Sequence, residues 1–89
     1  MRLKSGFVLQ EVGGTFLAVA VGERADELRV LIKLNSTGAF LWNILAERDV
    51  SEDELVDALL SEYDVTEELA RSSVAAFVRS VSDGGLLDG

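Results

Sequence analysis

Two clusters of carboxylates, Glu52–Glu54 and Glu67–Glu68, are the residues of this chain whose types and spacing could do acid–base chemistry. Neighbouring carboxylates can serve as a general acid and a general base, or can hold a cation through oxygen ligands. Each cluster directly follows a residue that suits a helix cap, Ser51 in one case and Thr66 in the other. Acids in a first helical turn complement the partial positive charge there. We therefore predict that both clusters stabilise and solvate helix ends rather than catalyse a reaction.

Other catalytic groups are missing, because the sequence has no histidine and no cysteine. The chain thus lacks the imidazole base, the thiol nucleophile and the nitrogen and sulfur ligands that many catalytic and metal sites use. The acidic residues do not have the spacing of an EF-hand loop either. We predict a protein that is not an enzyme and needs neither a cofactor nor a metal ion.

The charge balance is acidic, with 16 Asp and Glu against 8 Lys and Arg and a net charge of −8. Non-specific affinity for nucleic acid depends on Lys and Arg that displace counterions from phosphates, and anionic membrane surfaces repel an acidic protein. No apolar run approaches the roughly 20 residues that span a bilayer, and the N-terminus has no apolar signal segment. We expect a cytoplasmic protein without nucleic-acid or membrane partners.

The elements that position these residues change in type at Asn35. A length of 89 residues suits one domain, residues 1–89. Apolar runs before Asn35 predict three strands: Phe7–Val12, Thr15–Val21 and Leu28–Leu34. Gly13–Gly14 separates the first two strands and predicts a type I′ hairpin, since that turn needs a positive φ at both central positions.

After Asn35 the apolar residues follow a helical period, which predicts three helices. Suitable caps precede each helix: Asn35 or Ser36, Ser51 in a capping box with Glu54, and Thr66. Gly84–Gly85 ends the third helix, because a left-handed cap favours glycine. The expected core contains seven residues from these helices: Phe40, Leu41, Ile44, Leu55, Leu59, Val74 and Phe77.

The predicted fold class is α+β and winged-helix-like, with an N-terminal three-stranded antiparallel sheet followed by three helices. Three strands cannot close into a barrel, so at least one edge of the sheet keeps unpaired backbone groups. The third strand contains no proline, and Lys33 is the only charge in its inner part, so it has few of the features that protect sheet edges. This edge is a candidate site for pairing with a partner.

Two residues near the start of the first helix have two interpretations each. A glycine such as Gly38 in a first helical turn lowers the stability of the helix by up to ~1 kcal/mol relative to alanine. It either lets the helix pack closely on the sheet, which we favour, or gives a ligand access. Trp42 falls roughly 130° from the centre of the apolar stripe, at ~100° per residue. It is either part of the core, which we favour, or an anchor for an interface.

The segment "IKLNSTGAFLWNIL" and the elements after it resemble the PqqD-like family, whose members are also called RiPP recognition elements. The resemblance covers about residues 7–87 and rests on an ordered set of positions. These are Leu34, Asn35 and Thr37 at the end of a strand, Leu41–Trp42 in the first helix, Tyr63 and Val65 before the third helix, and Gly85, Leu86 and Leu87 at the end.

The resemblance implies a non-catalytic binding module. Members of the family bind the leader segment of a ribosomally made precursor peptide and present it to a modifying enzyme, often a radical SAM enzyme. The founding members serve pyrroloquinoline quinone biosynthesis, and relatives serve other peptide pathways. In the family the leader adds as a strand to the third strand and lies in a groove walled by the third helix, which agrees with the open edge described above.

The resemblance places the peptide backbone along five residues of the third strand: Arg29, Val30, Leu31, Ile32 and Lys33. The peptide side chains would meet one flank of the third helix. With Ala70, Val74, Phe77 and Val81 as the buried stripe, the flank that we predict consists of Val78 at the margin and Arg71, Ala75 and Ser82 beyond it. The opposite flank, Ser73, Ala76 and Ser80, is the competing wall, and the sequence chooses only weakly between the two.

Two alternatives belong to other classes. A winged-helix reader of DNA or RNA would need basic residues on the third helix, but the segment 67–83 has only Arg71 and Arg79 against Glu67, Glu68 and Asp83. A docking module or homodimer could pair through the same open edge, in which case it would compete with the peptide.

Overall fold

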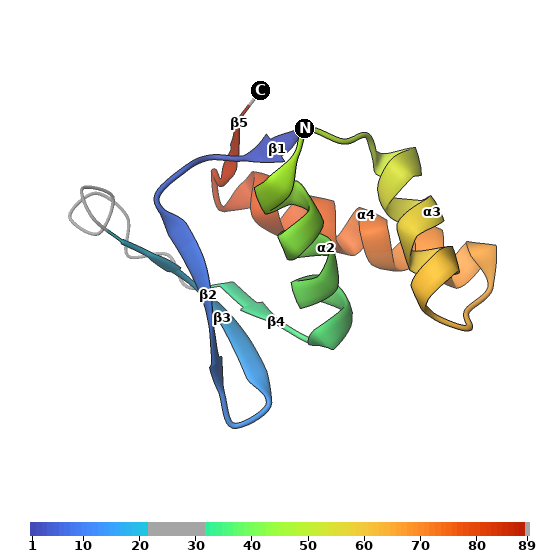
Figure 1. Ribbon diagram of the computed structural model, residues 1–89, viewed down its shortest axis with the longest axis horizontal. Coiled ribbons are helices and arrows are strands. Elements are labelled where there is room, and N and C mark those ends of the chain that lie inside the picture. Colours follow the sequence, from blue (N-terminus) through green and yellow to red (C-terminus); the bar gives the residue numbers. More distant parts are fainter. Residues whose placement is uncertain (22–31, 89) are drawn as a thin grey trace.

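The computed structural model describes residues 1–21 and 32–88. In chain order the elements are β1 (Arg2–Leu3), β2 (Phe7–Val12), β3 (Thr15–Ala20), β4 (Ile32–Leu34), α2 (Ser36–Glu47), α3 (Glu52–Glu62), α4 (Glu67–Asp83) and β5 (Leu87–Asp88). A three-stranded antiparallel sheet precedes three helices, so the predicted α+β class is confirmed (Figure 1). The part of the predicted third strand before Ile32 lies outside the described residues.

The hairpin β2–β3 forms at the two glycines. Val12 pairs with Thr15, which leaves Gly13 and Gly14 as the two turn residues. Their φ angles are 59° and 82°, so both central positions are positive, as the predicted turn requires. Thus a local signal, two adjacent glycines between apolar runs, fixes the start of the sheet.

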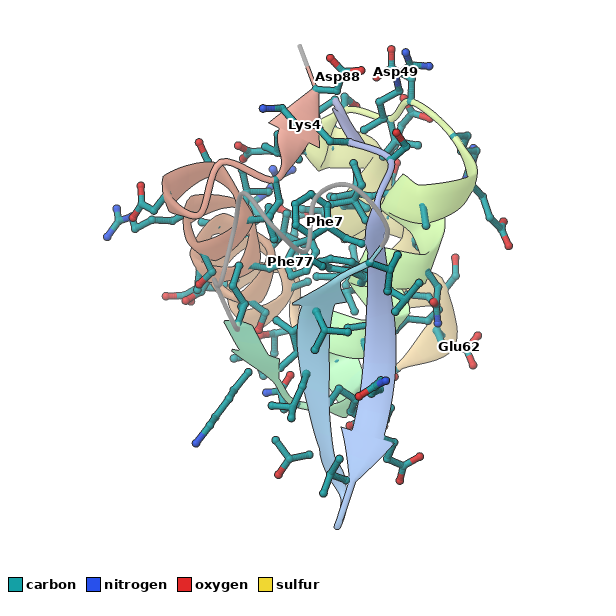
Figure 2. The ribbon with its side chains drawn as sticks, turned by 90° about the vertical axis from the view of Figure 1, so that its left-hand side faces the viewer. Lys4, Phe7, Asp49, Glu62, Phe77 and Asp88 are labelled. Carbon is teal, nitrogen blue, oxygen red and sulfur yellow. The ribbon has the colours of Figure 1, made fainter. Side chains whose placement is uncertain are left out.

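Strand β4 lies at one edge of this sheet, whose order is β2-β3-β4. Leu34 pairs with Phe16 and Ile32 pairs with Ala18 in the antiparallel register. Paired residues share a face of the sheet, and this face carries the buried residues Ala18 and Leu34. Figure 2 shows β4 next to α4, with Phe7 and Phe77 pointing into the space between the sheet and the helices.

The predicted helix caps are confirmed. The Asn35 side chain accepts a hydrogen bond from the Gly38 N–H at 2.8 Å. Ser51 and Glu54 form the reciprocal capping box, and the Thr66 hydroxyl accepts from the Leu69 N–H at 3.1 Å. These contacts satisfy backbone N–H groups that have no partner within their own helix.

Helix α4 ends in a left-handed turn. Gly85 has a φ of 73°, its N–H donates to the Ser82 carbonyl at 3.0 Å, and the Leu86 N–H donates to the Val81 carbonyl at 2.9 Å. This is the Schellman pattern, and Leu86 is buried beside it. The chain then turns so that β5 pairs with β1, with Leu87 opposite Leu3. This small second sheet was not predicted.

The core largely agrees with the prediction. Leu41, Leu55, Leu59, Val74 and Phe77 are buried. Phe40 and Ile44 also pack against this core, although they are only partly buried. The Phe40 ring meets the Tyr63 ring edge to face, with centroids 5.5 Å apart. These residues cover the α2–α3 side, while the opposite side of α2 faces the sheet.

Trp42 belongs to the core, with only 2% of its surface exposed. Helix α2 contacts β3 and β4 on one side and α3 and α4 on the other, so it is central in the domain. Residues far from its main apolar stripe are therefore also buried. The interpretation of Trp42 as a core residue is confirmed.

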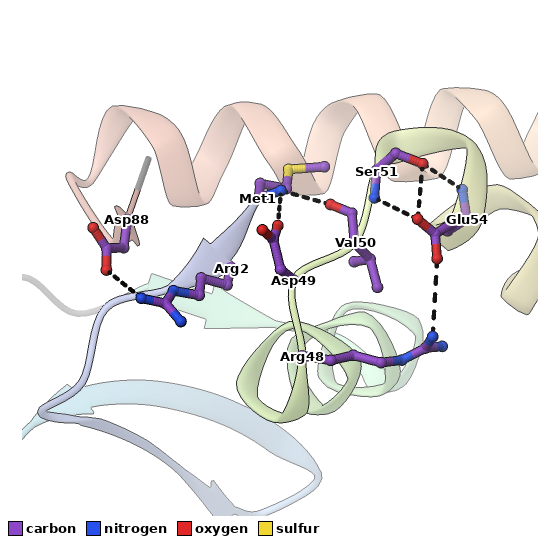
Figure 3. A network of polar contacts seen from close by, with 8 residues as sticks. All are labelled: Met1, Arg2, Arg48, Asp49, Val50, Ser51, Glu54 and Asp88. Atoms are coloured by element: carbon purple, nitrogen blue, oxygen red, sulfur yellow. Dashed lines mark hydrogen bonds and ion pairs between the residues drawn. The ribbon is translucent and has the colours of Figure 1, made fainter.

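Polar contacts at the N-terminal end join β1 to the turn between α2 and α3 (Figure 3). The Met1 ammonium donates to the Asp49 carboxylate at 2.5 Å and to the Val50 carbonyl at 2.7 Å. The hydrogen bond from this ammonium, and its charge, lower the pKa of Asp49. Asp49 is exposed, and exposed ion pairs of this kind contribute little to stability.

Candidate functional site

A groove runs between the edge strand β4 and helix α4. It has a volume of about 370 Å³. Its lining comes from the end of β4, the start of α2 and one flank of α4: Lys33, Leu34, Asn35, Thr37, Gly38, Leu41, Ser72, Ser73, Ala76, Phe77 and Ser80. Residues distant in the sequence therefore meet at one open surface beside the sheet edge.

The floor and the wall of the groove differ in chemistry. Leu34, Leu41 and Phe77 are buried apolar residues that form the floor. The α4 wall consists of small side chains, three serines and Ala76, which leave room for another chain. Serine hydroxyls both donate and accept hydrogen bonds. The groove thus offers apolar contact below and polar contact at its side.

The groove lies beside an open strand edge. Strand β4 pairs with β3 on one side, and no strand among residues 1–21 and 32–88 pairs with its other side. An edge strand presents N–H and C=O groups to whatever lies next to it. Lys33, which is exposed, is the only ionisable side chain that residues 1–21 and 32–88 contribute to the groove lining. The described part of the lining thus leaves backbone groups of an edge strand accessible and contains no acid–base pair.

Gly38 is required by close packing. A Cβ atom at this position would lie 3.1 Å from both Cβ and Cδ2 of Leu34, so the predicted close contact between α2 and the sheet is confirmed. Gly38 also lines the groove, next to the Asn35 cap. One residue thus brings the helix start against β4 and shapes the surface between them.

The four α4 residues of the predicted flank lie outside the groove lining. Arg71 faces α3, where it pairs with Asp53 at 3.2 Å and with Glu67 of its own helix at 3.5 Å. The hydrogen bond to Asp53 and the charge of Glu67 raise the pKa of Arg71. Val78 is partly buried against the core, and the remaining two, Ala75 and Ser82, are exposed.

The competing flank lies at the groove, since Ser73, Ala76 and Ser80 all line it. Of the predicted strand residues, Lys33 lines the groove and Ile32 packs against the core. The remaining three, Arg29, Val30 and Leu31, lie outside the described residues. The assignment of a flank stays a prediction, and the position of the groove is an argument for the second flank.

Several groove residues were not named as site residues from the sequence: Leu34, Asn35, Thr37, Gly38, Leu41, Ser72 and Phe77. The available signal was Gly38, a glycine within a first helical turn directly after a strand. It indicated close approach of two elements, and such approaches shape grooves. Asn35 was identified as a helix cap, and Leu41 and Phe77 were identified as core residues, which they also are.

The described residues contain no group of three or more Asp or Glu that could hold a metal ion. Within the same part of the chain, every buried side-chain nitrogen or oxygen has a hydrogen-bond partner. None of the described helices is long and apolar enough to cross a membrane.

The fold and the groove define a small winged-helix-like binding domain with an open strand edge. Residues 8–87 match the family described as Coenzyme PQQ synthesis protein D (PqqD). Because this match covers most of the chain, the chain belongs to the PqqD family. No curated protein matches the sequence significantly.

Two solved structures have a similar fold. One is "TbiB1 in Complex with the TbiA(beta) Leader Peptide", with a TM-score of 0.72 and 21% identity, covering 100% of this chain and 96% of that one. The other is "Lasso peptide synthetase B1 complexed with the leader peptide", with a TM-score of 0.67 and 24% identity, covering 96% of this chain and 93% of that one. At these identities the likeness establishes the shared fold.

Proposed function

We propose that this protein binds the leader segment of a ribosomally made precursor peptide in the groove between β4 and α4. The observation that carries the proposal is the open edge of β4 directly beside a groove with an apolar floor and a wall of small residues. An extended peptide that adds to an exposed sheet edge gains main-chain hydrogen bonds, and pockets for alternate side chains give selectivity. Membership of the PqqD family and the leader peptides in the two similar structures support this function.

The contacts follow from the geometry of β-addition. The peptide backbone pairs with Ile32 and Lys33, and with the preceding residues Arg29–Leu31 as the sequence predicts. Every second peptide side chain then faces the groove, because side chains alternate along a strand. The floor favours apolar side chains at these positions. Lys33 is available for an acidic peptide residue, whereas Arg71 is already paired with Asp53 and Glu67.

The protein acts without catalysis and presents the bound peptide to a modifying enzyme in the cytoplasm, such as a radical SAM maturase. The family description points to pyrroloquinoline quinone synthesis as one such pathway. A net charge of −8 favours basic or neutral segments of the peptide and of the enzyme.

The experiment that tests this function uses the leader of a precursor peptide encoded beside this gene. An NMR titration of the isotopically labelled protein should shift the signals of Lys33–Gly38 and of Ser72–Ser80. Shifts confined to the β2–β3 hairpin or to α3 would contradict binding in the groove.

A matched pair of variants tests which flank of α4 contacts the bound leader peptide. Ala75 and Ala76 are adjacent, exposed alanines of α4, and only Ala76 lines the groove. Ala76→Glu should weaken leader binding at least about tenfold, which corresponds to ~1.4 kcal/mol, while Ala75→Glu should leave it within about twofold. Circular dichroism checks that both variants keep the same helix content. The reverse result would move the site to the flank of Ala75, Val78 and Ser82.

A further inference from the structure

A second, smaller pocket adjoins the groove. Its volume is about 90 Å³, and it is lined by residues of all three helices and of the α3–α4 turn: Thr37, Leu59, Tyr63, Val65, Leu69, Ala70 and Ser73. Thr37 and Ser73 line both the pocket and the groove. The pocket therefore lies next to the groove at these two residues, within reach of a side chain of a chain in the groove.

The chemistry of the pocket is mostly apolar. Leu59 and Ala70 are buried at 2% and 1% exposure, and Tyr63 and Val65 are partly buried around them. Leu69 lies at the rim with 53% of its surface exposed, one of only four large exposed hydrophobic residues in the described chain. Covering this leucine would remove apolar surface from water, which is favourable. The volume suits one aliphatic or aromatic side chain.

The pocket lies near the carboxyl end of the edge strand β4. Thr37 follows the carboxyl end of β4, so the pocket lies beyond the point where strand pairing with β4 ends. A peptide that pairs with β4 and continues past Leu34 passes this point. Its next residues lie along α4 near Ser73, where a side chain can enter the pocket.

We infer that this pocket selects a single large apolar side chain of the peptide, placed just outside the segment that pairs with β4. The inference rests on the proposed function and adds a sequence requirement to it. If the peptide runs antiparallel to β4, the apolar residue precedes the paired segment, and if it runs parallel, the residue follows it. Exposed Asp64 and Glu68 adjoin the lining residues in sequence, so the peptide residues beside the apolar one should be neutral or basic.

The experiment uses a display library of short randomised peptides selected on the wild-type protein. Enriched peptides should share one Leu, Ile, Met, Phe, Tyr or Trp at a fixed distance from an extended segment. In the best binder, replacing this residue by alanine should weaken binding to the wild type about tenfold, measured by fluorescence anisotropy. The same replacement should have an effect below about twofold on the variant Leu69→Ser, because its pocket has lost the apolar rim.

Val12→Ser is the matched control, since Val12 is also an exposed apolar residue, at 60%, but lies in the hairpin. This variant should respond like the wild type. If selected peptides lose binding to Ala76→Glu but share no large apolar residue, or if Leu69→Ser and Val12→Ser respond alike, the pocket inference is wrong while the groove function stands. If selected peptides bind Ala76→Glu as well as the wild type, the groove function itself is wrong.

Discussion

Gly38 is the residue at which fold and site depend most directly on one missing atom. An added Cβ would meet Leu34 at 3.1 Å, so the edge strand or the start of α2 would have to move. Overpacking of this kind costs about 1–3 kcal/mol, and the better helix propensity of alanine returns at most ~1 kcal/mol. We expect Gly38→Ala to lower the free energy of unfolding by about 1 kcal/mol, measured by urea denaturation.

The control for this prediction is Ala39→Gly, which removes a methyl group at the adjacent helical position without adding one beside Leu34. It should also destabilise the domain, through propensity and lost packing of the buried Ala39, but should leave the signals of Leu34 unchanged. A gain in stability for Gly38→Ala would show that the contact with Leu34 relaxes without cost.

Individual residues were predictable from the sequence where their role is local. Asn35, Ser51 and Thr66 cap helices because a side-chain oxygen reaches an N–H group within the next turn, and sequence spacing determines this contact. Trp42 was harder to place, because its burial depends on elements that surround α2 from several sides. Helical periodicity describes one buried stripe and does not reveal how many neighbours a helix has.

At the scale of elements, the edge of β4 leads to a prediction about the peptide backbone. Groups along an edge strand point alternately toward and away from a pairing chain. N-methylation of single peptide bonds in the leader should therefore weaken binding at every second position and have little effect at the positions between. Isothermal titration calorimetry of a methylation series measures this pattern. Uniform effects along the peptide would indicate that side chains alone bind it and that β4 does not pair with it.

Elements that meet only through tertiary packing were not predictable. The β1–β5 pair joins Leu3 to Leu87, and strands of two residues have no alternating pattern to detect. The flank of α4 had the same difficulty. The apolar stripe of Ala70, Val74 and Phe77 fixes which side of α4 faces the core, and it leaves two flanks at equal distance from that side. The docking of α4 against β4 then determines which flank borders the groove.

At the scale of the whole molecule, charge separates peptide binding from nucleic-acid binding. The net charge is −8, and in the described chain the exposed face of α4 offers Arg71 and Arg79 as its basic residues. Arg71 is already paired with Asp53 and Glu67, so it cannot neutralise a phosphate without losing those contacts. A recognition helix needs free basic groups, and α4 therefore suits a groove wall better than a DNA-reading surface.

We accordingly expect no measurable binding to random duplex DNA at physiological salt, measured by fluorescence anisotropy. Affinity for DNA arises mainly from the release of counterions by Lys and Arg, and this protein has twice as many acidic as basic residues. A leader peptide should behave differently, because its main-chain hydrogen bonds and apolar contacts do not depend on counterion release. Its affinity should change by less than about threefold when salt is raised from low to physiological concentration, whereas contacts to several phosphates would change it by orders of magnitude. Sub-micromolar binding to DNA with a steep salt dependence would contradict this prediction, and it would support a winged-helix reader in place of a peptide-binding domain.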